Sequence, residues 1–260
     1  GSLMSWRRVW TIAHHVFREG LRDRIIYLLP VYALGIFGIS PLLRDVALGA
    51  EQKILLDLGI AAMQFLGLVV AIFIGTNLIA KEIDKRTIFI LMAKPLRRSE
   101  LIVGKQLGLS VLLSLVLVLM GLSYVAVLWL QGVNAPWAAL LVAMGFIWIE
   151  WVVVVAAALL FGSFTTPILA ILYTIAFYSV GHLSRSILEL GRVTRSEAVG
   201  RLSEALYLIL PDLDRLNLKN DAVYGSLPPA SELWEHGFYG LIYAMLLLSL
   251  SILIFERRQF

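Results

Sequence analysis

Six long apolar stretches dominate the amino-acid sequence and leave few folds open to the chain. They cover residues 25–43, 55–80, 101–130, 137–162, 164–184 and 238–255. A helix needs about 20 mostly apolar residues to cross the hydrocarbon core of a bilayer. Hydrophobic residues make up 60% of the 260 residues, which is more apolar surface than a water-soluble domain of this size can bury. We therefore predict an all-α polytopic membrane protein, with six transmembrane helices in a single transmembrane domain over 1–260.

The placement of basic residues predicts which ends of the spans face the cytoplasm. The stretch before the first span is rich in arginine, and residues 81–105 carry seven basic and three acidic side chains. The connections expected on the other side, 44–54, 131–136 and 185–237, carry no net positive charge. Lysine and arginine are enriched in cytoplasmic connections. We therefore expect both termini and the charged connection in the cytoplasm, and residues 185–237 as an extracytoplasmic loop. Because the basic residues cluster beside the spans, no nucleic-acid partner is expected.

Residues 5–24 are predicted to form an interfacial elbow helix before the first span. Apolar residues recur there at helical spacing, namely Trp6, Val9, Trp10, Ala13, Phe17 and Leu21. The opposite face carries Arg7, Arg8, His14, Arg18 and Arg22. Tryptophans on one face and arginines on the other suit a helix that lies in the membrane interface.

A second helix is expected in the extracytoplasmic loop, before the last span. Its apolar stripe ends at Pro211 and consists of Ile187, Leu188, Val199, Leu202, Leu206, Leu208 and Ile209. A polar segment, 212–220, follows this stripe.

The chain lacks the motifs of common catalytic and cofactor sites. The Gly104-Lys105 pair has neither the upstream glycine nor the following Ser or Thr of a phosphate-binding loop. The four histidines are scattered, and no metal site is expected from their spacing. We therefore predict that the chain by itself is not an enzyme and holds no cofactor.

Glu150 is an ionisable residue deep within a predicted span. Burying its charge costs several kcal/mol, so the side chain should face protein or a water-filled cavity, or be protonated. Two interpretations stay open: a contact on a translocation pathway, or a hydrogen-bonded packing residue. Gln64 and Asn77 in the second span pose the same choice. The small-residue stripe Gly67, Ala71 and Gly75 predicts close packing against another helix.

The charged connection contains an apolar centre. Ile88, Phe89, Leu91 and Met92 lie between basic residues, and Pro95 ends any helix that they form. Such a short helix can lie on the membrane surface and fill a groove of a partner protein. Positive-inside anchoring alone would explain Lys81 and Lys85, but not this apolar centre.

The sequence resembles the permease subunits of type-two ABC exporters, and most closely the branch of multicopper-enzyme-maturation permeases. The resemblance rests on an E-x-x-x-x-T-x-x-x-L, P-x-x-R and G-K pattern. This pattern is formed by Glu82, Thr87, Leu91, Pro95, Arg98, Gly104 and Lys105. Segments 17–24, 210–220 and 255–260 give further support, so the resemblance extends along the chain.

The resemblance implies a half-transporter that pairs with a second permease copy and with cytosolic ABC ATP-binding subunits, which hold ATP and Mg. A coupling helix at 87–91, within a coupling loop at 81–100, would contact the ATP-binding subunit. The implied contact residues are Glu82, Arg86, Thr87, Ile88, Phe89, Leu91, Met92, Pro95 and Arg98. Export by alternating access in a prokaryotic cytoplasmic (inner) membrane is implied as well, with the loop at 185–237 capping the outer end of the pathway.

Two other functions stay open from the residues alone. One is a self-contained secondary transporter or channel, which usually shows several polar residues along a pathway and internal repeats. The other is a non-transporting scaffold that recruits a cytosolic protein through the same loop. The sequence does not indicate a substrate.

Overall fold

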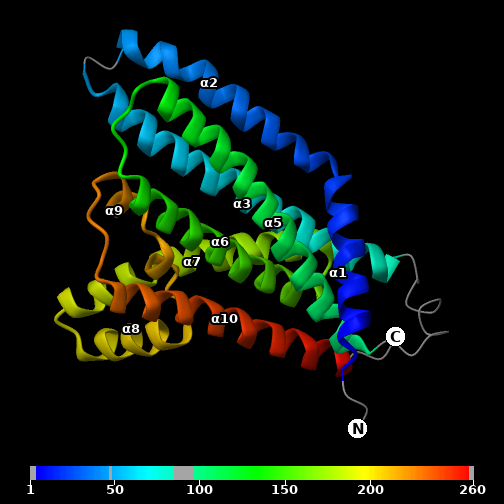
Figure 1. Ribbon diagram of the computed structural model, residues 1–260. Helices are drawn as coiled ribbons and strands as arrows, with labels where there is room; N and C mark the ends of the chain where they lie inside the picture. The colour runs from blue at the N-terminus through cyan, green and yellow to red at the C-terminus, as the bar shows by residue number, and fades with distance from the viewer. Residues whose placement is uncertain (1–3, 47–48, 85–96, 258–260) are drawn as a thin grey trace.

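The computed structural model describes residues 4–46, 49–84 and 97–257, and within these ranges it is helical with no β-strand (Figure 1). The helices are α1 (Trp6–Leu21), η1 (Arg24–Tyr27), α2 (Leu28–Val46), α3 (Glu51–Asp84), α5 (Arg98–Leu130), α6 (Trp137–Gly162), α7 (Pro167–Val193), α8 (Glu197–Ile209), η2 (Leu213–Leu216), α9 (Lys219–Val223) and α10 (Ala230–Arg257).

Six helices in the described part of the chain are long and apolar enough to cross a membrane, which confirms the predicted all-α polytopic fold. They are Arg24–Val46, Glu51–Lys81, Arg98–Leu130, Trp137–Gly162, Pro167–Val193 and Ala230–Arg257. The largest differences from the predicted ranges are in α7 and α10. α7 continues past residue 184 to Val193, and α10 already begins at Ala230. Hydropathy underestimates these ends because polar residues there continue the helix beyond its apolar part.

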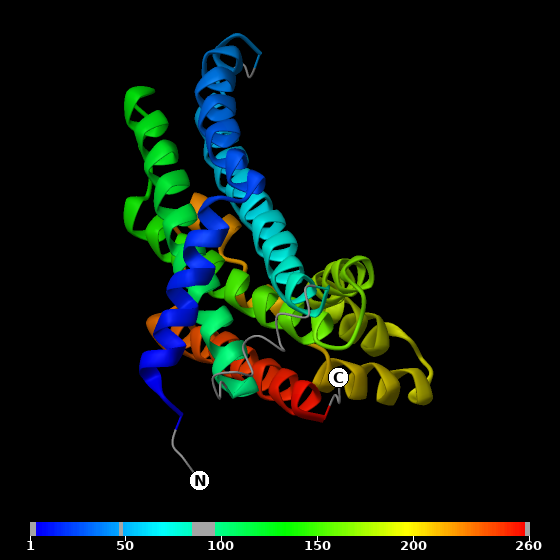
Figure 2. The same ribbon diagram turned by 90° about the vertical axis from the view of Figure 1, so that its right-hand side faces the viewer.

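α1 lies across one end of the bundle and packs on α5 (Figures 1 and 2). We call this the α1 end, and α3 and α10 both finish there (Figure 1). A Cβ atom added to Gly104 would lie 2.7 Å from the Cβ of Ile12, and one on Gly108 would lie 2.6 Å from the carbonyl oxygen of Ala13. The two glycines therefore permit a contact that larger residues would prevent.

The apolar face predicted for α1 is present, but only one part of it is buried against the bundle. Val9, Ala13 and Val16 are buried against the bundle, whereas Trp6 and Trp10 are 67% and 70% exposed. At 100° per residue these residues form one continuous arc, with the buried residues towards one edge of it and the two exposed tryptophans towards the other. Helical periodicity does not distinguish an apolar face that meets protein from one that meets lipid.

α6 is the central helix of the bundle, and most of its length is buried. The Trp151 ring occupies the space that a side chain at Gly67 would need, and its Nε1 donates a hydrogen bond to the Gln64 carbonyl oxygen at 3.2 Å. A Cβ on Gly75 would lie 3.0 Å from that of Ala158. The small-residue stripe of α3 is thus a packing seam against α6, as predicted.

The helix predicted before the last span is present as α8, but the apolar stripe over 187–209 is divided between two helices. The chain leaves α7 at Val193 and begins α8 at Glu197, and Leu208 and Ile209 are 83% and 74% exposed. The segment that packs on the bundle comes later, at 212–223. Its apolar residues Leu213, Leu216, Leu218 and Ala222 are buried. It therefore forms part of the bundle, at the end that carries α9, which we call the α9 end (Figure 1).

Candidate functional site

Most of the predicted coupling residues lie outside the described residues, so their role stays a prediction. These residues are Arg86, Thr87, Ile88, Phe89, Leu91, Met92 and Pro95. The structure places Glu82 in the last turn of α3 and Arg98 at the start of α5. Both helix ends lie at the α1 end.

The start of α5 is fixed to α10 through Arg98. The guanidinium donates hydrogen bonds from Nη1 to the carbonyl oxygens of Phe255 at 2.7 Å and Glu256 at 3.1 Å. It also lies over the Phe255 ring, 5.7 Å from the ring centroid. Arg98 therefore has a structural contact within the chain besides the partner contact implied by the resemblance.

Two further buried charged residues fix α5 to its neighbours at this end. The Glu100 carboxylate accepts a hydrogen bond from the backbone N–H of Ser5 at 2.8 Å and lies 3.8 Å from the Arg8 guanidinium. The Lys105 ammonium donates to the Leu78 carbonyl oxygen of α3 at 2.9 Å, and Lys105 is 2% exposed. The segment between α3 and α5 thus joins helices that are tied to α1 and α10.

Glu150 lies in a polar network that connects four elements. Gln64 of α3 donates from Nε2 to one carboxylate oxygen of Glu150. The other oxygen is 2.8 Å from Nε2 of His182 on α7, and Nδ1 of His182 is 2.9 Å from Oδ1 of Asp214 in η2. The Glu150 side chain has no exposed surface, whereas those of His182 and Asp214 are 21% and 28% exposed.

The structure brings Gln64 and Glu150 together but leaves Asn77 apart. Asn77 lies about 20 Å further along α3, at 1.5 Å per residue, and is half-buried. Sequence reasoning missed His182 and Asp214 as partners of Glu150. Each contact joins residues 32 positions apart on different elements, so no local spacing could have indicated it.

A cavity of about 400 Å³ lies between α3 and α7 beside this network. Its lining consists of Gln64, Phe65, Leu68, Val69, Ile72, Phe73, Ile175, Tyr178 and Lys219. Because the Gln64 amide nitrogen faces a carboxylate, its Oε1 points elsewhere, and among the described residues this oxygen has no hydrogen-bond partner. The cavity therefore combines apolar walls with a buried acceptor and a cation.

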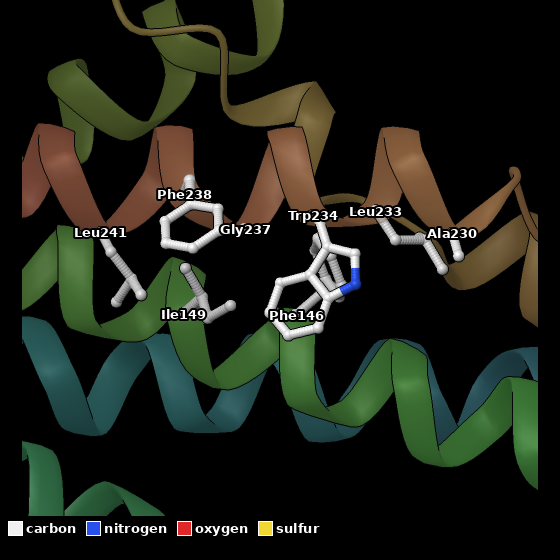
Figure 3. A pocket seen from close by; sticks show the side chains of 8 residues that line it. All are labelled: Phe146, Ile149, Ala230, Leu233, Trp234, Gly237, Phe238 and Leu241. Atoms are coloured by element: carbon white, nitrogen blue, oxygen red, sulfur yellow. The ribbon is translucent and has the colours of Figure 1, made fainter.

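A second, purely apolar groove of about 300 Å³ lies between α6 and α10 (Figure 3). The rings of Trp234 and Phe238 are stacked with centroids 5.9 Å apart, and they project over Phe146 and Ile149 of α6. Among the residues that the structure describes, no titratable side chain and none of the predicted site residues lines this groove. Its lining suits contact with apolar groups such as acyl chains, and it provides no acid, base or charged group.

Asp212 is the hub of a separate ionic cluster at the α9 end. Its Oδ2 accepts hydrogen bonds from Tyr207 at 2.8 Å, Arg185 at 3.0 Å and Arg215 at 3.1 Å. Burial by itself raises the pKa of the Asp212 carboxyl, but the donors together outweigh burial and hold its pKa below the usual value. The ionised carboxylate thus joins α7, α8 and η2.

The six apolar helices, with α1 lying across one end, define a polytopic α-helical membrane protein with a buried polar network in its core. Comparison with known protein families identifies it further. Residues 10–260 match the family described as ABC-2 family transporter protein, so the chain belongs to this family and is a membrane subunit of an ABC transporter. None of the curated proteins compared with the chain matches it.

Proposed function

We propose that this chain is the permease subunit of an ABC exporter, in the branch of multicopper-enzyme-maturation permeases, and that it moves its substrate by alternating access. A separate cytosolic subunit binds ATP with Mg and supplies the energy. The observation that carries the proposal is the family match together with the end of α3 and the start of α5, which both lie at the α1 end. In this arrangement the protein lies in a prokaryotic inner membrane, with both termini and the segment between α3 and α5 on the cytoplasmic side.

The contacts around this segment support a coupling role. Its two attachment points lie on α3 and α5, and α5 is held to α1, α3 and α10 by Glu100, Lys105 and Arg98. Because these tethers are short, a displacement of the coupling loop at 81–100 moves several helices together. This is what coupling between an ATP-binding subunit and the spans requires.

The cavity between α3 and α7 is the candidate translocation pathway in each permease copy. Apolar walls with a few polar groups are typical of small-molecule sites, and the volume lies in their usual range. Gln64 lines the cavity and donates a hydrogen bond to Glu150. A substrate that contacts Gln64 would therefore alter the hydrogen bonds of Glu150. We expect two identical copies to assemble, because symmetric homo-oligomers are the common arrangement.

Copurification tests the docking step. The tagged chain is co-expressed with its native ATP-binding subunit, and the amount of that subunit retained on the affinity resin is measured. Phe89→Asp should abolish retention, because a charge replaces the apolar residue that fills the partner groove. The matched control is Leu208→Asp, the same type of change at an exposed site at the α9 end. Equal retention by Phe89→Asp and Leu208→Asp would refute docking through this segment.

The network of Glu150, His182 and Asp214 is a specific observation in favour of the alternative function, a secondary transporter. A titratable chain inside a membrane domain is a feature of proton-coupled transporters. The two functions differ in their energy source. Vanadate-sensitive ATP hydrolysis by the complex supports the ABC permease, and uptake or efflux by the chain alone, driven by an ion gradient, supports the alternative.

A further inference from the structure

Glu150, His182 and Asp214 form a line of three titratable side chains that runs from the core towards the surface. The two ring nitrogens of His182 lie 2.8 Å from Glu150 and 2.9 Å from Asp214. The exposed fraction of the side chains rises along the line, from 0% through 21% to 28%. A fully buried carboxylate is therefore connected to the surface through one imidazole.

The number of protons decides whether both contacts are hydrogen bonds. A neutral imidazole has one N–H donor and one lone pair, and an ionised carboxylate only accepts. A neutral ring between two carboxylates can donate to one of them, while its lone pair faces an oxygen of the other. Both short contacts become hydrogen bonds only when one further proton is present, on the second ring nitrogen or on a carboxyl oxygen.

The described neighbouring groups do not replace this proton between His182 and the two carboxylates. Gln64 already donates to the second oxygen of Glu150. Arg185 and Arg215 are held by Asp212 and do not contact the line in the structure. Tyr178 of α7 lies edge-on to the His182 ring and close to Glu150. Titratable groups on the packed elements also include Tyr207 of α8, Lys219 and Asp221 of α9, and His236, Tyr239 and Tyr243 of α10.

The line also joins the 212–223 segment to the transmembrane helices. Asp214 belongs to η2, whose Leu213 packs where a side chain on Gly181 of α7 would lie and whose Leu216 packs against Gly240 of α10. We propose that Glu150, His182 and Asp214 form a proton-binding site, and that the bound proton fastens the 212–223 segment to α6 and α7.

The exchange of this proton needs only the groups in the line. A proton from water at the α9 end arrives at Asp214 and is taken up by Nδ1 of His182, while the Nε2–H donates to Glu150. On release it returns to water by the same route, and only N–H and O–H bonds change. Without it, one ring lone pair faces a carboxylate oxygen, and the repulsion releases the segment. No step depends on ATP or on transport, so this proposal can be tested separately from the proposed function.

The absence of cysteine from the sequence allows a direct test by thiol labelling. Ala222 is fully buried in the segment, whereas Asn220, two residues earlier, is exposed. Ala222→Cys and Asn220→Cys are made separately in the full chain, which is placed in lipid nanodiscs and labelled with a water-soluble maleimide. The ratio of the two labelling rates cancels the effect of pH on thiol reactivity. The ratio should rise by about tenfold between about pH 6 and about pH 9 as the proton is lost.

Asp214→Asn removes the need for the proton, because the amide N–H can donate to the ring lone pair while the other ring nitrogen donates to Glu150. In this background the ratio should stay low across the same pH range. Asp221→Asn, the same change elsewhere on the segment, should keep the rise, and His182→Ala should give a high ratio at every pH. A flat ratio in the parent chain, or a pH-dependent rise that persists in Asp214→Asn, would overturn the proposal, even where His182→Ala does not fold.

Discussion

The Glu150 carboxylate of α6 lies 2.8 Å from Nε2 of His182 on α7, and Glu150 has no exposed surface. This contact decides how the ionisable residue in the core is accommodated. Its carboxylate is not left alone in an apolar environment, because Gln64 holds one oxygen and His182 the other. A buried charge with hydrogen-bond partners of this kind is tolerated where an isolated one is not.

Glu150→Gln should change turnover more than assembly. The amide has nearly the same shape and can hydrogen-bond to His182, so the fold and the complex should persist. If release of the 212–223 segment is part of the cycle, the neutral pair stays fastened, and the rate of ATP hydrolysis by the complex should fall by about tenfold. Glu235→Gln, an exposed change on α10, serves as the control. Equal loss of assembly and hydrolysis in Glu150→Gln would show a packing role instead.

Gly108→Ala should destabilise the chain at the contact between α1 and α5. The added Cβ would lie 2.6 Å from the Ala13 carbonyl oxygen, a backbone atom that cannot move away easily. We expect a loss of about 1–3 kcal/mol in the free energy of unfolding. Gly145→Ala on α6 is the matched control, because its Cβ meets nothing within 4 Å. Thermal unfolding in nanodiscs measures both, and equal midpoints would contradict the close contact.

Arg98→Gln should loosen the start of α5 from the end of α10. The change removes two charge-assisted hydrogen bonds to the carbonyl oxygens of Phe255 and Glu256. Such bonds contribute about 1–3 kcal/mol each when buried, and less here because Arg98 is partly exposed. Hydrogen exchange of the last turn of α10 should therefore become faster. Arg192→Gln, at an exposed site near the other end of the bundle, should leave that turn unchanged. Unchanged exchange in Arg98→Gln would mean that the tether contributes little.

Acidification should weaken the ionic cluster around Asp212. Its pKa is lower in the folded chain than in the unfolded chain, because the donors outweigh the effect of burial. The resulting stabilisation is fully present above the unfolded value near 4 and is lost as the pH falls through the folded value. Asp212→Asn should lower stability by about 2 kcal/mol at neutral pH and reduce this acid dependence. Unfolding midpoints at about pH 7 and about pH 3 check the prediction, and identical acid dependence in both chains would contradict it.

The sequence predicts the spans well because lipid imposes a simple rule, namely about 20 apolar residues in helical form. The same rule explains the errors at α7 and α10, whose polar ends continue as helix. On α1, apolar spacing indicates a helix correctly but does not reveal that Val9 meets α5 while Trp6 stays exposed.

The polar network could be predicted only in part. Glu150 and Gln64 are conspicuous because they are polar residues within apolar stretches. His182 and Asp214 lie in a region whose polarity is compatible with a solvated loop, and their link to Glu150 depends on the return of the 212–223 segment to the bundle. That return results from tertiary packing of Leu213 and Leu216 against glycines on two helices, which no local pattern encodes.

We propose that an ATP-binding subunit drives this membrane subunit through the segment between α3 and α5. The most direct measurement is vanadate-sensitive ATP hydrolysis by the purified complex of the chain with its native ATP-binding subunit in nanodiscs. We predict hydrolysis in the parent complex and in Leu208→Asp, with loss of complex-dependent hydrolysis in Phe89→Asp. If hydrolysis by the ATP-binding subunit is the same with the parent chain, with Phe89→Asp and without any chain, the claim is contradicted.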